Sequence, residues 1–296
     1  MTTALFIEQV FNGLQLGMLL FLVAVGVTLV FGVMNLVNLS QGALVMAGGY
    51  LFAASIKATS SYLLGATMAI AGLAIIAVLI ETIVLRRLYA RPHIDQVLAT
   101  FGLMLMFNEG VVMIWGRDPM FIAIPPVLSG SVPLFPGVEY PAYRLAVTGI
   151  AAALGVALHL LVTRSRLGML IRAGADKREM IQLLGVDIAF LYLVVFGLGA
   201  ILGGVAGMLL GPIAAVTTGM GDPILILALV CVVIGGLGSI GGAFAAAMVI
   251  GMADTFGRVL LPQMLGAGTG QAVANMIVYL VMAAILIWRP SGLASR

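Results

Sequence analysis

Only a few side chains in this chain could carry acid–base or ion-pair chemistry, and they lie within or beside long apolar runs. Glu109 and Glu81 fall in such runs, and Asp254 and Arg258, four residues apart, could pair on one helix face. An ionisable group in an apolar run is a candidate for binding a substrate or moving a proton, because lipid does not solvate its charge. For Glu109, a structural hydrogen bond to a neighbouring helix is an equally good interpretation. These groups are too few to form a proton relay.

Four polar side chains interrupt the apolar sequence near the N-terminus. Asn35, Asn38, Ser40 and Gln41 lie between two apolar runs with no real loop to separate them. Amides without partners are costly in hydrocarbon. The pattern therefore favours a broken or re-entrant helix whose polar groups line a translocation pathway. A short cytoplasmic turn, or hydrogen bonding between helices, would explain the same residues.

A glycine-rich tract at residues 235–242, GGLGSIGG, is the second interruption. It resembles a phosphate-binding loop only superficially: no lysine follows the glycines and both flanks are apolar, so we reject nucleotide binding. The small residues either allow close helix packing or break a helix and expose backbone groups to a central path, and the two readings are compatible. The candidate pathway residues are therefore Asn35, Asn38, Ser40, Gln41, Glu109, Gly236, Gly238 and Ser239.

A charged insert at residues 164–187 carries five of the fourteen Lys and Arg residues and lies between two apolar runs. Asp176 followed by Glu179 has the form of a capping box, and Gly185 is well placed to end the helix. The helix between them would be roughly 12 Å long, which is too short to be stable alone. The insert therefore needs a partner surface.

The helix expected in the insert has one apolar face, made by Met180, Leu183 and Leu184, and basic residues elsewhere. A groove in a separate protein is the sharper interpretation of this face, and the lipid interface or the chain's own bundle is the alternative. The candidate docking residues are Arg172, Asp176, Lys177, Arg178, Glu179, Met180, Leu183, Leu184 and Gly185.

The elements that must position these residues are membrane spans. Of the 296 residues, 62% are hydrophobic and 8% charged, against roughly 25% charged in an ordinary soluble domain. We expect one all-α polytopic membrane domain over residues 1–296, with about eight to ten transmembrane helices, some broken or re-entrant. The apolar runs cover residues 10–31, 42–56, 62–85, 97–115, 145–162, 188–210, 224–252 and 272–288.

The basic residues predict how the chain is oriented in the membrane. If the spans alternate, ten of the fourteen Lys and Arg residues fall on one side, after the runs at 62–85 and 145–162 and after the last run. Positive residues mark the cytoplasmic side, so the C-terminus is expected there and the N-terminus outside. The net charge of +3 reflects these loops rather than nucleic-acid binding. The proline-rich external loop at residues 116–143 suits an ordered cap.

Four motifs together resemble the permeases of bacterial ABC importers, specifically the branched-chain amino acid (LivH-type) family. GVTLVFGVMNLVNLSQGALVMAGGY at residues 26–50 is similar to the family's N-terminal signature, although Gln41 stands where members usually have histidine. RAGADKREMIQLLGVD at 172–187 is similar to its coupling loop, VVIGGLGSIGGAF at 232–244 to its glycine-rich signature, and WRPSGL at 288–293 to its ending. The resemblance covers nearly the whole chain.

The resemblance implies a permease subunit of the bacterial inner membrane that catalyses no reaction of its own. Such a subunit pairs with a second, usually homologous permease and with two cytoplasmic ATPase subunits. A periplasmic binding protein delivers the substrate. This chain has no Walker motif, so it is expected not to be an enzyme and to bind no cofactor, with ATP and Mg on the ATPase subunits.

Three classes of function remain open from the sequence. The first is an importer permease for branched-chain or other hydrophobic amino acids, and the same family resemblance admits amides, urea or small carboxylates. The second is an autonomous channel or ion-coupled carrier, whose signature would be more intramembrane carboxylates than this chain has. The third is a membrane scaffold without transport activity.

Overall fold

The computed structural model describes residues 3–89, 91–135, 138–176, 182–183, 185–289 and 292–294. Within them, eight helices are long and apolar enough to cross a membrane, and a further apolar helix is shorter. The expected all-α polytopic fold is therefore confirmed. The long helices are α1 (Thr3–Met34), α2 (Gln41–Thr59), α3 (Tyr62–Ile80), α5 (His93–Trp115), α6 (Ala142–Arg164), α9 (Ile188–Leu210), α11 (Ile240–Leu265) and α12 (Ala267–Trp288), and the shorter one is α10 (Gly221–Gly235).

Shorter elements extend or connect these helices. A π-helical turn, η1 (Glu81–Leu85), and α4 (Arg86–Leu88) prolong α3, and α7 (Arg166–Asp176) follows α6. The described residues of the proline-rich loop form an ordered structure, as expected. It contains the 3₁₀ turn η2 (Pro126–Leu128) and the antiparallel strands β1 (Ser131–Phe135) and β2 (Val138–Pro141).

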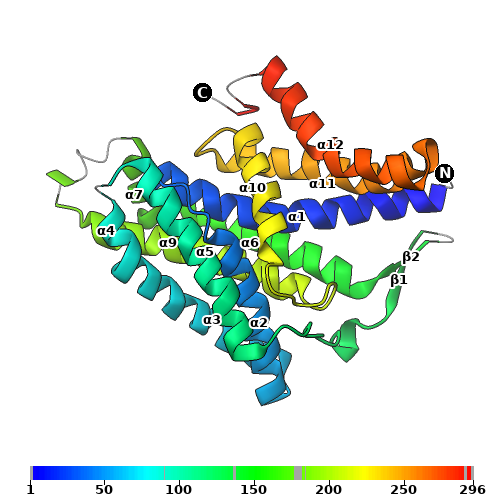
Figure 1. Ribbon diagram of the computed structural model, residues 1–296, viewed down its shortest axis with the longest axis horizontal. Coiled ribbons are helices and arrows are strands. Elements are labelled where there is room, and N and C mark those ends of the chain that lie inside the picture. The colour runs from blue at the N-terminus through cyan, green and yellow to red at the C-terminus, as the bar shows by residue number, and fades with distance from the viewer. Residues whose placement is uncertain are drawn as a thin grey trace.

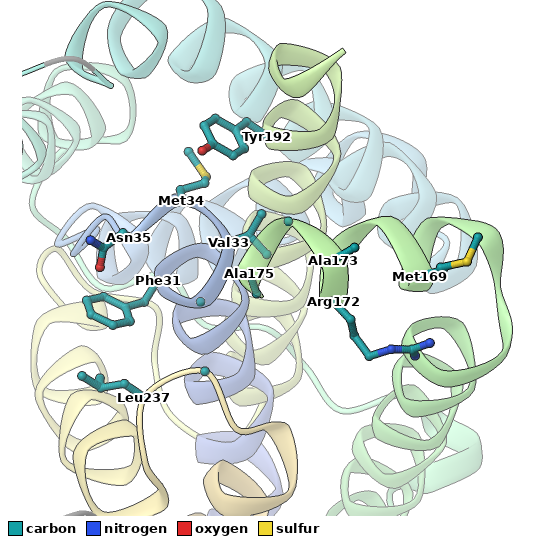
Figure 2. A pocket seen from close by; sticks show the side chains of 13 residues that line it. Phe31, Val33, Met34, Asn35, Met169, Arg172, Ala173, Ala175, Tyr192 and Leu237 are labelled. Atoms are coloured by element: carbon teal, nitrogen blue, oxygen red, sulfur yellow. The ribbon is translucent and has the colours of Figure 1, made fainter. Parts of the chain in front are cut away.

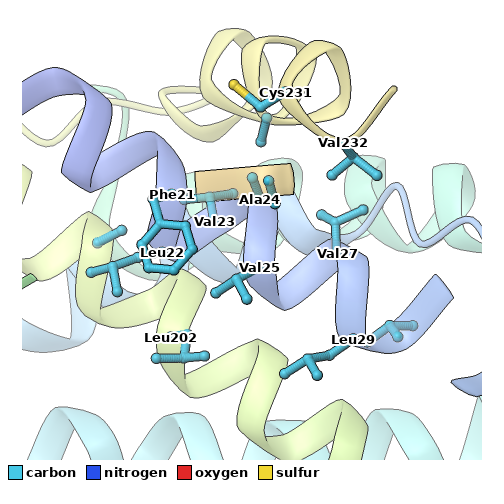
Figure 3. Close-up of a cluster of buried hydrophobic side chains, with 14 of the residues drawn as sticks. Phe21, Leu22, Val23, Ala24, Val25, Val27, Leu29, Leu202, Cys231 and Val232 are labelled. Atoms are coloured by element: carbon cyan, nitrogen blue, oxygen red, sulfur yellow. The ribbon is translucent and has the colours of Figure 1, made fainter. Parts of the chain in front are cut away.

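The core surrounds α1, which is apolar on all sides, as is typical of a buried helix. Figure 3 shows its side chains between Leu202 of α9 and Cys231 and Val232 of α10. Less than a third of the apolar stretch of each outer helix, α3, α5, α6 and α12, is buried against the rest of the protein, which suits contact with lipid. In Figure 1, α1 and α11 run side by side across the molecule.

Glycines let the central helices approach at the backbone. A Cβ added at Gly26 of α1 would lie 2.9 Å from the carbonyl oxygen of Gly199 in α9. A Cβ at Gly207 of α9 would overlap the carbonyl oxygen of Val45 in α2. Close packing at these glycines therefore brings the helix backbones together, since even an alanine would separate them.

Two helices, α2 and α10, begin inside the bundle rather than at its surface. Gln41, the first residue of α2, donates a hydrogen bond from Nε2 to the carbonyl oxygen of Gly199, halfway along α9. Gly42 packs against Gly221, the first residue of α10. Both α2 and α10 therefore start at mid-depth. Figure 1 shows them leaving the centre in opposite directions.

The two ends of the bundle carry different features. At one end the hairpin packs on α1: Asn12 accepts hydrogen bonds from Tyr140 (3.0 Å) and Arg144 (2.6 Å). Arg258 lies on the same end, because Phe256 stacks on Phe6 near the start of α1. The opposite end holds α4, α7 and the end of α1 (Figure 1). The described arginines that follow η1 and α6 lie at that opposite end, so the predicted grouping of charge is found in the structure.

Candidate translocation site

A cavity of about 1130 Å³ lies at the end of the bundle that holds α7. It is lined by the end of α1, by α7, by the start of α9 and by the loop after α10 (Figure 2). Three residues singled out from the sequence meet here: Asn35 and Gly238 as pathway candidates, and Arg172 from the insert. The cavity therefore joins the predicted pathway to the predicted coupling loop.

Asn35 is where α1 ends and the first break begins. Its φ is +52°, a left-handed conformation that asparagine tolerates better than most residues. Its backbone N–H donates to the carbonyl oxygen of Phe31 at 2.8 Å, which closes the last turn of α1. The side chain is exposed on the cavity wall, as Figure 2 shows.

The other polar residues of the first break are buried instead of lining this cavity. Asn38 is 1% exposed, and its Oδ1 accepts hydrogen bonds from the backbone N–H of Ser40 (3.1 Å) and the Ser40 hydroxyl (2.6 Å). Gln41 is fully buried and bonded to Gly199. The predicted helix break is confirmed. The buried side chains of Asn38 and Gln41 stabilise it through their hydrogen bonds.

The glycine-rich tract breaks the chain between α10 and α11. Gly236 (φ +91°) and Gly238 (φ +84°) adopt a backbone conformation that residues with a Cβ rarely reach. Ser239 then caps α11, since its Oγ accepts a hydrogen bond from Gly242 N–H at 3.1 Å. Gly238 also packs against Gly32 of α1. Both readings of the tract, a helix break and close packing, are therefore found together.

Glu109 lies away from this cavity, on an exposed part of α5. The residue before it, Asn108, donates a hydrogen bond from Nδ2 to Oδ2 of Asp222 at 3.2 Å. Asp222 lies in the first turn of α10 and was not a candidate from the sequence. Its only signal there is an acidic residue at the start of an apolar run, next to Pro223.

The insert contains a helix that the sequence pattern did not predict, α7, which ends at Asp176. The helix expected between Asp176 and Gly185 lies mostly outside the described residues. Arg172 of α7 donates a hydrogen bond from its guanidinium to the carbonyl oxygen of Val162 in α6. Gly185 has φ +81° and its N–H bonds to Gln182 O, as expected of a residue that ends a helix. Leu183 is 88% exposed. Lys177, Arg178, Glu179, Met180 and Leu184 lie outside the described residues.

The remaining ionisable candidates form local pairs. Glu81 is fully buried in η1, accepts a hydrogen bond from the Tyr89 hydroxyl at 2.8 Å and lies 3.5 Å from Arg86. The Tyr89 ring stacks edge-on against Tyr192, which lines the cavity. This contact links the end of α3 to the cavity wall.

The predicted pair between Asp254 and Arg258 is also present, at 2.7 Å. Arg258 further donates to Asn275 of α12 at 3.2 Å, so the pair connects α11 to α12.

Comparison with known proteins decides the family. The family described as "Branched-chain amino acid transport system / permease component" matches residues 9–287. The chain belongs to this family. The high-affinity branched-chain amino acid transport system permease protein BraD of Pseudomonas aeruginosa is 27% identical over 307 residues, which cover 98% of this chain and 96% of BraD.

Two further relatives come from other organisms. The high-affinity branched-chain amino acid transport system permease protein LivH of Escherichia coli is 26% identical over 306 residues, covering 98% of this chain and 96% of LivH. The probable branched-chain amino acid transport permease protein LivH of Methanocaldococcus jannaschii is 27% identical over 286 residues, covering 93% and 88%. The matched residues therefore cover nearly the whole chain in each of these comparisons.

Proposed function

We propose that this chain is a transmembrane permease subunit of an ATP-driven importer for branched-chain or other hydrophobic amino acids. The observation that carries the proposal is the cavity shared by Asn35, Gly238 and Arg172. In this cavity, α7 of the charged insert forms part of the wall, together with residues from the two places where the helices break. A family match over residues 9–287 supports the transport role.

We place the cavity end of the bundle in the cytoplasm of a bacterial inner membrane. The described arginines after η1 and α6 lie at this end, with α4 and α7 (Figure 1). The C-terminal segment is held beside it, because Leu293 N–H bonds to the carbonyl oxygen of Ile234 at 2.8 Å. An excess of positive residues marks the cytoplasmic side. The N-terminus and the hairpin would then face the periplasm.

The proposed assembly supplies what this chain lacks. Two ATPase subunits bind ATP and Mg and contact the insert at residues 164–187, a second homologous permease completes the passage, and a binding protein delivers substrate at the hairpin end. Movement of the insert reaches the cavity through α7, whose Arg172 holds the end of α6 at Val162. Coupling is then a mechanical change in access to the cavity.

The test is transport by the assembled complex in liposomes. The chain is produced with its partner permease, ATPase subunits and binding protein, and uptake of radiolabelled leucine is measured with and without ATP inside. We expect uptake only with ATP and binding protein together. ATP-driven uptake of urea or amides in place of leucine would change the assigned substrate. Flux by this chain alone without ATP would favour a channel or carrier.

A further inference from the structure

The meeting point of α2 and α10 concentrates buried polar atoms. Gly42 and Gly221 bring the two helix starts into contact at mid-depth. Around them, buried nitrogen or oxygen atoms have no hydrogen-bond partner among the residues that the structure describes. These atoms are Asn38 Nδ2, Gln41 Oε1, Asn108 Oδ1, Thr218 Oγ1 and Asp222 Oδ1.

Such atoms are costly to bury in a membrane protein. Each buried polar group without a partner loses its hydration without replacing it. Asn38 and Gln41 are 1% and 0% exposed, so water at the bundle surface does not reach them. The unpaired atom of each amide is not needed to hold its own segment in place. The other atom of the amide already makes the structural hydrogen bond, from Ser40 to Asn38 and from Gln41 to Gly199. The free atoms are therefore available to a ligand.

Asp222 adds a charge to this junction. No basic side chain pairs with it in the described part of the chain, where Arg86–Glu81 and Arg258–Asp254 are the ion pairs. One carboxylate oxygen accepts from Asn108, and the start of α10 offers the partial positive charge of a helix N-terminus. Its second oxygen, Oδ1, is left for a cationic or donor group.

The free atoms are divided by polarity. On the α5 and α10 side they are acceptors: Asp222 Oδ1, Asn108 Oδ1 and the Thr218 oxygen. Before the start of α2 the free Asn38 Nδ2 is a donor, and the α2 N-terminus adds partial positive charge. The free Gln41 Oε1 is an acceptor outside these two groups, because the Gln41 amide packs against Gly26 of α1 and Gly203 of α9. An ammonium group fits the first side and a carboxylate fits the second. An α-amino acid carries both groups on one carbon.

The junction also borders an uncovered face. Glu109, beside Asn108 on α5, is exposed, as are Pro223 and Ile226 on α10. A carboxylate such as Glu109 is costly against lipid, so this face suits a polar space better than hydrocarbon. A substrate that passes along this face would reach Asp222 by a small separation of α5 from α10.

We propose that the junction of α2, α5 and α10 is a binding site for the zwitterionic backbone of an α-amino acid. Asp222, with Asn108 and Thr218, receives the ammonium group, and Asn38 with the start of α2 receives the carboxylate. The inference rests on the proposed function and deepens it. These atoms would contact the ammonium and carboxylate groups of the substrate and not its side chain, so one site serves several amino acids.

The test uses the assembled transporter, purified without its binding protein, and equilibrium binding of radiolabelled leucine. Unlabelled leucine, leucinamide and 4-methylpentanoate compete, since the amide lacks the carboxylate and the acid lacks the ammonium group. We expect leucine to compete at least tenfold better than either analogue. Equal competition by 4-methylpentanoate, or the absence of saturable leucine binding, would overturn the proposal.

Variants assign the binding to this junction. Asp222→Asn should weaken leucine binding at least tenfold and abolish the preference over 4-methylpentanoate. Thr218→Val keeps the shape of the side chain and should weaken binding about threefold, so it serves if Asp222→Asn fails to assemble. Asp118→Asn, on the exposed loop after α5, is the matched control and should bind as the wild type does. Wild-type binding by both Asp222→Asn and Thr218→Val would contradict the site.

Uptake driven by ATP and the binding protein separates this site from the proposed function. If the wild type imports leucine while both variants import and bind it normally, the function stands and the site is wrong. If the wild type binds leucine at the junction but imports none with ATP, the site stands and the importer role is wrong.

Discussion

Gln41, the first residue of α2, donates a hydrogen bond from its side chain to the carbonyl oxygen of Gly199, halfway along α9, at 2.7 Å. The two residues are 158 positions apart in the chain. This bond anchors the start of a helix that begins inside the bundle. It gives the amide one partner at a depth where hydration is absent, and it fixes how far the chain re-enters after α1.

Removal of this anchor should destabilise the bundle. We expect Gln41→Ala to cost about 1–2 kcal/mol, because it removes an interhelical hydrogen bond and leaves a void. The measurement is the fraction of complex that stays monodisperse after heating, read by size-exclusion chromatography. Thr67→Ala, on exposed α3, is the control and should melt as the wild type does. Equal melting of Gln41→Ala would show that the bond does not support the break.

Glycines on one helix should differ in their tolerance of a methyl group. Gly207→Ala places a Cβ against the carbonyl oxygen of Val45, and we expect a loss of about 1–3 kcal/mol. Gly197→Ala on the same helix has no atom within 4 Å of its Cβ among the described residues, and it should be neutral or slightly stabilising. Yield and thermal melting of the two variants are compared directly. Similar behaviour would contradict the close packing of α9 on α2.

The end of the insert should control coupling rather than folding. Gly185 has φ +81°, which proline cannot adopt, so Gly185→Pro should rearrange the end of the insert while leaving the spans in place. If the insert transmits the ATPase cycle, ATP hydrolysis should persist while leucine uptake falls at least tenfold. Replacement of the apolar face at Met180, Leu183 and Leu184 by alanine should act in the same direction. Wild-type uptake in these variants would exclude the insert as the coupling element.

The contact of the hairpin with α1 should weaken at high pH. Burial raises the pKa of the Tyr140 hydroxyl, and the nearby Arg144 opposes the rise. A raised pKa means that the neutral phenol is the form favoured by folding. Its stabilising contribution is therefore present below about pH 10, the unperturbed value, and is lost as the pH rises through the folded-state pKa.

Ultraviolet absorbance of ionised tyrosine measures this directly, as the difference between the wild type and Tyr140→Phe. We expect the Tyr140 component to appear above pH 10, later than a free tyrosine. Ionisation of this component at or below the free value would contradict the burial of its hydroxyl against Asn12.

The sequence by itself determined that lipid is the solvent, that about eight to ten helices cross it, and where the chain breaks between them. These are local properties: long apolar runs, amides at residues 35–41 and glycines at residues 235–242 mark themselves whatever surrounds them. The run at residues 188–210 coincides with α9, and the paired Asp254 and Arg258 follow from helical spacing alone.

Only the tertiary structure decided which of these residues share a site. Asn35 opens onto the cavity while Asn38 and Gln41 are buried, although all three lie in one break. Asp222 becomes a candidate only because it bonds to Asn108, 114 positions away, and lies near the start of α2. Periodicity reports which face of one helix is apolar, whereas depth and partners depend on contacts between distant helices. Those contacts exist only once the backbones have packed at their glycines.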